Sequence, residues 1–91
     1  MSKVLISYDL NQPGRDYAHI TERIKALGAA SWCHPLESVW LIITAASAAA
    51  VRDDLQNYAD ASSKLLVIDV TGDAMAWAGI ADEAADWLRA N

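Results

Sequence analysis

The chain has 91 residues, of which 54% are hydrophobic, and a formal net charge of −5. This length suits one domain, residues 1–91, and the apolar fraction exceeds what one small monomer encloses comfortably, so we expect a homodimer. The acidic charge is concentrated in residues 69–91, where five acidic residues stand against Arg89. The chain therefore lacks the basic surface that is typical of a strong nucleic-acid-binding protein.

The sequence also predicts a soluble, cytoplasmic protein. Its one cysteine, Cys33, cannot form an internal disulfide. The N-terminus lacks the basic segment and apolar run of a secretory signal. No apolar stretch approaches the ~20 residues that cross a bilayer, so we expect no membrane partner.

The first predicted element is a strand over residues 3–9 (KVLISYD), which is dense in β-branched and aromatic residues. Pro13 and Gly14 then suit the central positions of a type II turn. A helix is expected from Asp16, as its cap, to Leu27, with Gly28 as its C-terminal stop. Its apolar face repeats every three or four residues and consists of Tyr17, Ile20, Ile24 and Leu27.

Two strands are expected next, around a break near residues 35–38, and the second covers residues 39–44. This second strand is apolar on both faces, which places it in the middle of a covered sheet. Ser47 is expected to begin an alanine-rich helix with Val51, Leu55 and Tyr58 on its apolar stripe.

A fourth strand is predicted over residues 64–70 (KLLVIDV) and a last helix over residues 80–90. The order is therefore β-α-β-β-α-β plus a C-terminal helix, which is the plan of a ferredoxin-like α+β sandwich. In that plan the first and third strands are central and both internal helices cover one face. The other face is too apolar to remain bare, so the terminal helix, a second protomer, or both should cover it. The edge of the fourth strand is apolar as well, so we expect the homodimer to form through the open sheet face or through this edge.

Asp9 is the main candidate for chemistry, because it ends a central strand just before a turn. Two copies brought together by a twofold axis would offer the oxygen ligands that Mg²⁺ or Mn²⁺ prefers, and such an ion activates water for attack on a phosphodiester. The alternative is that Asp9 caps the following turn through the backbone, as aspartate commonly does. A lone aspartate is a weak motif, and the pattern alone favours the cap.

Several short motifs resemble a known family. They are "SYDL" at residues 7–10, "LG" at 27–28 closing the first helix, and "SVW" at 38–40 opening the third strand. Together they look like the CRISPR-associated protein two family, whose members are small ferredoxin-like homodimers.

With "LLVIDVTGD" at residues 65–73 and "AWAG" at 76–79, the chain also resembles short bacterial proteins labelled SinR-like. That label suggests a helix-turn-helix repressor, which the strand-rich pattern contradicts. The resemblance covers about residues 3–79.

The resemblance implies that Asp9 is the metal-binding residue of a nuclease-type site and that Ser38 is its polar neighbour. Some family members are metal-dependent nucleases that act on RNA or DNA, and VapD-type toxin ribonucleases form a related branch. Others serve as adaptors in the spacer-integration complex. This sequence departs from the nuclease pattern in its acidity, with only Arg15 as a basic residue near the loop after Asp9.

The remaining chemistry-bearing residues favour structural roles. Cys33 and His34 are adjacent, so on a strand they point to opposite faces and do not share a metal. His19 is expected on the helix surface. Trp40 and Trp87 are expected in the core or an interface, whereas the sequence indicates the environment of Trp32 and Trp77 less clearly.

Two hypotheses of function follow. The first is a non-catalytic homodimeric adaptor or regulatory module, in which Asp9 caps a turn and the acidic C-terminal segment meets a protein partner. The second is a metal-dependent nuclease that uses paired Asp9 with help from Ser38 and Arg15. Composition favours the first hypothesis and the family resemblance favours the second.

Overall fold

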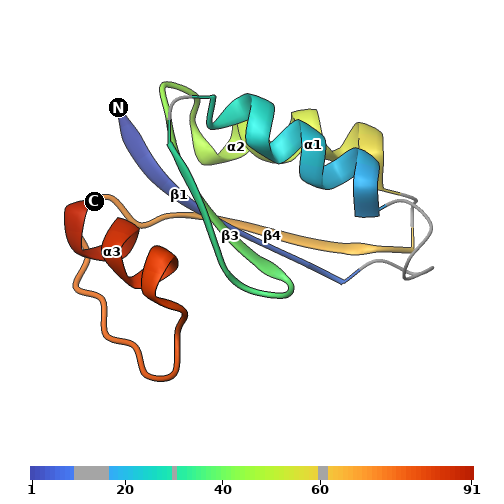
Figure 1. Ribbon diagram of the computed structural model, residues 1–91. Coiled ribbons are helices and arrows are strands. Elements are labelled where there is room, and N and C mark those ends of the chain that lie inside the picture. Colours follow the sequence, from blue (N-terminus) through green and yellow to red (C-terminus); the bar gives the residue numbers. More distant parts are fainter. Residues whose placement is uncertain (10–16, 30, 60–61) are drawn as a thin grey trace.

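A computed structural model describes residues 1–9, 17–29, 31–59 and 62–91. The elements follow the predicted order (Figure 1), and a single 3₁₀ turn, η1, follows the second helix. They are β1 (Ser2–Asp9), α1 (Tyr17–Leu27), β2 (Trp32–Leu36), β3 (Val39–Thr44), α2 (Ala48–Leu55), η1 (Gln56–Tyr58), β4 (Lys64–Asp69) and α3 (Asp82–Ala90). Within the described ranges, no helix is long and apolar enough to cross a membrane.

The strands form one antiparallel sheet in the order β2-β3-β1-β4. The protein is therefore α+β, and the prediction that the first and third strands are central is confirmed. In β1, Ile6 lies opposite Trp40 of β3 on one side and Val67 of β4 on the other. Residues that face each other across antiparallel strands place their side chains on the same face, so this register decides which residues share the core.

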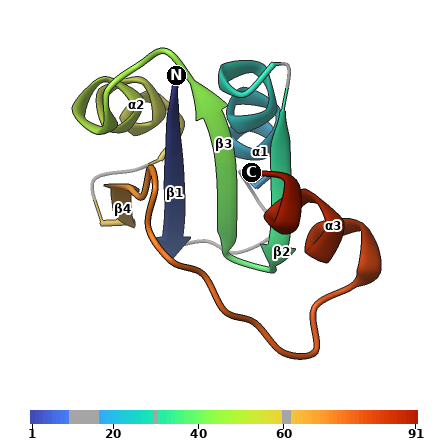
Figure 2. The same cartoon turned by 90° about the vertical axis from the view of Figure 1, so that its left-hand side faces the viewer.

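Helices α1 and α2 cover one face of the sheet (Figures 1 and 2). Alternate residues of β1 and β3 point to this face, because side chains along a strand alternate. They form the main core with the apolar stripes of the two helices: Val4, Ile6, Tyr8, Ile20, Ile24, Trp40, Ile42, Val51 and Leu55. The predicted stripes of both internal helices are confirmed at Ile20, Ile24, Val51 and Leu55, all fully buried.

An ion pair joins the solvent sides of α1 and α2. The Arg23 guanidinium donates two hydrogen bonds to the Asp54 carboxylate, of 2.7 and 2.6 Å. These bonds, together with the positive charge of Arg23, hold the pKa of Asp54 below its usual value. The pair fixes the two helices to each other at the edge of their shared core.

Helix α3 covers part of the opposite face, where it packs against β2. Leu88 and half-buried Trp87 of α3 meet Cys33 and Leu41 of the sheet. The Trp87 indole Nε1 donates to Ser31 Oγ at 2.7 Å. The sequence predicts that the terminal helix, a second protomer, or both cover this face. The terminal helix does cover part of it within a single protomer.

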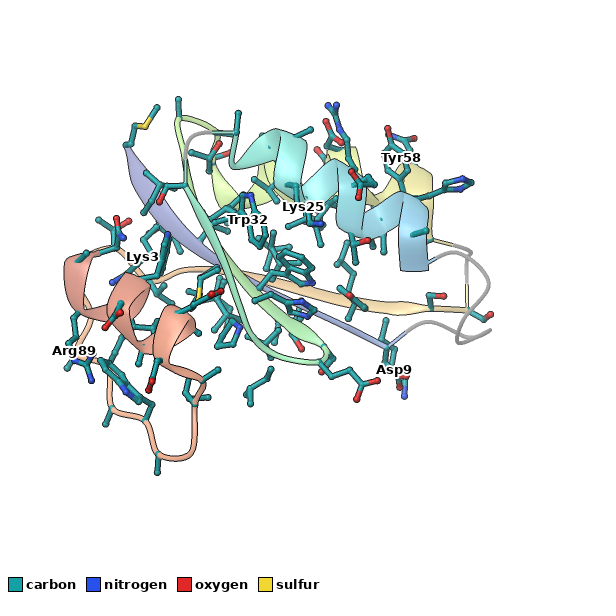
Figure 3. All side chains as sticks on the ribbon, in the orientation of Figure 1. Lys3, Asp9, Lys25, Trp32, Tyr58 and Arg89 are labelled. Carbon is teal, nitrogen blue, oxygen red and sulfur yellow. The ribbon has the colours of Figure 1, made fainter. Side chains whose placement is uncertain are left out.

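Lys3 is the main polar contact between β1 and α3 (Figure 3). Only 5% of this residue is exposed, and its Nζ donates to the carbonyl of Asn91, the C-cap of α3, at 3.0 Å. A cation at the C-terminal end of a helix also meets the negative end of the helix dipole. Lys3 therefore stabilises the docking of α3 on the sheet.

Several element boundaries differ from the prediction. β4 ends at Asp69 rather than Val70, because the Asp69 carboxylate accepts hydrogen bonds from the backbone and hydroxyl of Thr71 and so closes a turn. These bonds hold the pKa of Asp69 below its usual value. α3 begins at Asp82 rather than residue 80, because Ala81 has an extended backbone with a ψ of 148° and forms the N-cap.

At the start of α2 the predicted cap is confirmed, with Ser47 Oγ accepting from the Ala50 N–H at 3.1 Å. The helix proper ends at Leu55, and the half-buried Tyr58 lies in the following 3₁₀ turn rather than in the helix. The predicted Pro13–Gly14 turn and the Asp16 cap lie outside the described residues.

Gly28 ends α1 as predicted, but for a different reason than a left-handed backbone. Its φ is not positive, unlike that of Gly72 or Gly79. Instead, a Cβ at this position would lie 2.7 Å from Ile42 Cγ2 and 2.8 Å from Ile42 Cβ. Gly28 is therefore required by the close approach of the chain to the central strand β3.

We expect Gly28→Ala to lower the free energy of unfolding by about 1–3 kcal/mol, because the added methyl group overpacks against Ile42. Urea titration followed by circular dichroism measures this loss. Gly72→Ala is the matched control: its φ is 75° but the added methyl meets nothing within 4 Å, so it costs only about 1 kcal/mol of backbone strain. A Gly28→Ala variant as stable as the wild type would contradict the close-approach argument.

Candidate functional site

A cleft of about 630 Å³ lies where β1 ends. Four structural pieces meet there: the end of β1, the start of β4, the β2–β3 hairpin and α1. Figure 3 shows Asp9 at this end of the sheet, far from α3. The lining combines hydroxyl, carboxylate and cationic side chains with two leucines: Ser7, Tyr8, Asp9, Thr21, His34, Glu37, Ser38, Lys64, Leu65 and Leu66.

Two of the three predicted site residues, Asp9 and Ser38, line this cleft together. The backbone N–H of Tyr8 donates to the Ser38 carbonyl at 3.3 Å, so the hairpin turn lies against the last residues of β1. Asp9 follows Tyr8 at the end of the strand and is exposed. The third predicted residue, Arg15, lies outside the described residues, as does any turn that Asp9 would cap.

Lys64 is a neighbour of Asp9 that the sequence analysis did not identify. It is the first residue of β4 and lies directly opposite Asp9 in the β1–β4 register. Directly opposed residues have Cβ atoms about 4.5–5.5 Å apart, so the side chains of Lys64 and Asp9 start next to each other. Only the register of two strands 55 positions apart in the chain reveals this pair, and a strand pattern does not specify register.

His34 forms one wall of the cleft and is held in place by two contacts. Its ring stacks on Trp40 with centroids 3.8 Å apart and planes 12° apart. Its Nε2 lies 2.9 Å from the Glu37 carbonyl oxygen, which only accepts, so Nε2 donates this hydrogen bond. One of the two ring nitrogens is thus occupied by the hairpin itself.

The prediction that Cys33 and His34 point to opposite faces is confirmed. Cys33 is buried beneath α3, and burial raises the pKa of its thiol. His34 is exposed on the side of the sheet that carries α1. His19 is exposed, as expected for a surface position on α1.

A buried hydrogen bond lies beneath the cleft. Trp40 Nε1 donates to the Tyr8 hydroxyl at 3.2 Å, and the two residues are 2% and 6% exposed. The bond gives the indole N–H a partner inside the core and connects β1 to β3 through side chains. It holds both Tyr8 and the Trp40 ring on which His34 stacks.

The aromatic group continues from Trp40 toward the rim of the sheet. The ring of Trp32 lies 5.4 Å from that of Trp40, and Lys25 Nζ lies 5.2 Å from the centre of the Trp32 ring. Figure 3 shows Lys25 and Trp32 beside each other between α1 and β2. A cation over an indole face is attracted by the ring quadrupole, which accounts for the placement of the 40% exposed Trp32 without a ligand.

The described residues of the cleft bring together few ligands for a divalent cation. Asp9 and Glu37 both line the cleft, but in the part of the chain that the structure describes, no three His, Cys, Asp or Glu residues come together as metal ligands. Lys64, opposite Asp9, also lines this cleft and adds a positive charge to it.

Comparisons with protein families, with curated proteins and with solved structures found no match. What the cleft and the surfaces around it do must be inferred from their own residues.

We expect Tyr8→Phe to lower the free energy of unfolding by about 1–2 kcal/mol, because it leaves the buried Trp40 N–H without this acceptor. The measurement is urea denaturation of four proteins that form a double-mutant cycle: wild type, Tyr8→Phe, Trp40→Phe and the double variant. In the Trp40→Phe background, Tyr8→Phe should lower the free energy of unfolding by a clearly smaller amount. Equal costs in both backgrounds would show that the bond contributes nothing.

Proposed function

We propose that this chain is a homodimeric ferredoxin-like module that acts as a non-catalytic adaptor or regulatory protein. Two features support the ferredoxin-like assignment. Taken from the β4 edge, the strand order is β4-β1-β3-β2, as in the split βαβ plan, and α1 and α2 lie together on one face of the sheet (Figure 2).

The main support for a homodimer is the apolar surface that α3 leaves uncovered. Leu66 and Ile68 are 57% and 42% exposed. Leu66 and Ile68 belong to β4, an edge strand of the sheet. Large apolar side chains on an unpaired edge invite association with another chain, and a second copy is always available.

The outward side of α3 supports a second, different partner. Its exposed residues include Asp82, Glu83 and Asp86, and Arg89 is bonded to Asp86 at 2.8 Å. This side is acidic while the inward side holds Ala85 and Leu88 against the sheet. An adaptor that dimerises through its apolar surface would thus keep α3 accessible to a protein with a basic surface.

We expect the purified protein to have a mass of twice 9.8 kDa in solution, measured by sedimentation equilibrium. Because apolar burial rather than charge is proposed to hold the dimer, the mass should change little between low and high salt. A protein that sediments as a single 9.8 kDa chain over the whole concentration range would contradict the proposal.

A metal-dependent nuclease that acts on RNA or DNA is the second candidate, as the resemblance to the CRISPR-associated family implies. The specific observation in its favour is that Asp9 and Ser38 line the same cleft. In this candidate, the Asp9 carboxylates of two protomers would hold Mg²⁺ or Mn²⁺, which supplies a water molecule activated for attack on phosphorus. Arg15 would assist from the segment after β1.

The nuclease candidate predicts that wild-type protein cleaves labelled RNA or DNA with Mg²⁺ or Mn²⁺ and that Asp9→Asn does not. Asp53→Asn is the control, since it removes an exposed carboxylate of α2 that does not line the cleft and should leave cleavage unchanged. Thermal unfolding of each variant shows whether the fold survives. If Asp9→Asn instead loses about 1 kcal/mol of stability and no protein cleaves, Asp9 is a structural cap.

A further inference from the structure

The two edges of the sheet differ in how far they are protected from pairing. On β2, Pro35 has no N–H to donate, and the pairing with β3 shifts register between Cys33 and Leu36. α3 also packs against this strand (Figure 2). β4 contains no proline, and its six residues pair with β1 in one unbroken register. Proline and irregular pairing are the usual means of blocking an edge, so β2 is blocked and β4 is not.

The direction of the backbone groups on β4 follows from one hydrogen bond. The Val70 N–H donates to the Lys3 carbonyl of β1 at 2.8 Å. Because successive residues of a strand point their N–H and C=O groups to opposite sides, Leu66 and Ile68 also direct theirs toward β1. Leu65, Val67 and Asp69 direct theirs away from β1, to the free edge of the sheet.

Symmetry limits how two copies of this edge can pair. Opposed residues must place their side chains on the same face, so a twofold axis between two antiparallel copies must pass beside a residue, which then faces its own counterpart. An axis beside Val67 uses all three outward-directed residues within the strand. Leu65 then pairs with the partner's Asp69, and Val67 with the partner's Val67.

We propose that β4 pairs antiparallel with β4 of a second copy of this chain, with the twofold axis beside Val67. This inference rests on the proposed homodimer and names its interface. Leu66 then lies opposite the partner's Ile68 in a pair without mutual backbone hydrogen bonds, the closest kind of cross-strand contact, with Cα atoms about 4.5 Å apart. The two most exposed apolar side chains of β4 thereby cover each other, twice per dimer.

A second copy fits this edge better than an unrelated extended peptide for two reasons. The segment is self-complementary, since the twofold axis sets apolar Leu66 against apolar Ile68 on one face and Val67 against Val67 on the other. The pairing also closes: joining two copies of the sheet through β4 leaves only the two blocked β2 edges, so the dimer does not extend into a filament.

This interface separates the two proposed functions. Asp9 lies opposite Lys64, three residues along β4 from Val67. At about 3.4 Å per residue, each Asp9 lies ~10 Å from the axis along the strand, and the two copies lie ~20 Å apart in that direction alone. Two carboxylates so far apart cannot share a metal ion, so the β4 dimer supports the adaptor function and opposes paired-Asp9 catalysis.

The test is a cysteine pair. In the variant that carries both Leu66→Cys and Ile68→Cys, mild oxidation should link nearly all chains into dimers that separate on reduction, because opposed residues at this spacing meet disulfide geometry. The wild type is one control, since its only cysteine, Cys33, is buried. Each single variant is another: Leu66→Cys alone should link poorly, because the partner's Leu66 lies diagonally across the strands. Efficient linking by that single variant would overturn the axis at Val67.

A charge substitution provides an independent readout. Leu66→Lys should convert the dimer to a chain of 9.8 kDa, while Leu36→Lys should leave the dimer intact. The two leucines are exposed to the same extent, 57% and 56%, but Leu36 lies on the opposite edge strand.

The remaining outcomes also decide the question. A wild-type dimer that survives Leu66→Lys and does not form the double-cysteine link overturns the β4 interface but leaves the homodimer standing. A dimer that is lost in both lysine variants overturns the interface in favour of stacked sheet faces. A monomeric wild-type protein overturns both the interface and the homodimer.

Discussion

The structure depends on the central position of β1. This strand pairs with β3 on one side and β4 on the other, and its side chains are covered on one face by α1 and α2 and on the other partly by α3. A backbone this deeply placed needs every hydrogen bond satisfied, and the two neighbouring ladders supply them. Because β1 also carries Lys3 at its start and Asp9 at its end, its register positions both α3 and the cleft.

The two faces of the sheet are covered unequally, and this inequality produces the surface on which the proposed function rests. The face under α1 and α2 is a continuous core with Ile6, Ile24 and Ile42 fully buried. The other face has one short helix, held by Leu88 and by the bonds of Lys3 and Trp87. One nine-residue helix covers the β2 side of the sheet and leaves Leu66 and Ile68 on β4 bare. The excess of apolar residues that the composition indicates is thus exposed on β4, at Leu66 and Ile68.

The cleft and the β4 edge lie close together but support different functions. The cleft offers Asp9 and Ser38, the two described residues of the nuclease candidate, and Lys64 adds a positive charge opposite Asp9. The edge offers outward-directed backbone groups and two apolar side chains in a self-complementary arrangement. The proposed β4 dimer would keep the two Asp9 carboxylates too far apart to share a metal ion, so the geometry of the dimer is the property that would decide between adaptor and nuclease.

The sequence by itself determined the kind and order of the elements, because helical and strand periods, the Ser47 cap and Gly28 are local signals. It also identified Asp9 and Ser38 as candidate site residues. Only the tertiary structure decided the register that sets Lys64 beside Asp9, the contact with Ile42 that requires Gly28, and the face on which α3 docks. These depend on pairings between residues far apart in the chain, and a local pattern carries no information on which distant residue will stand opposite.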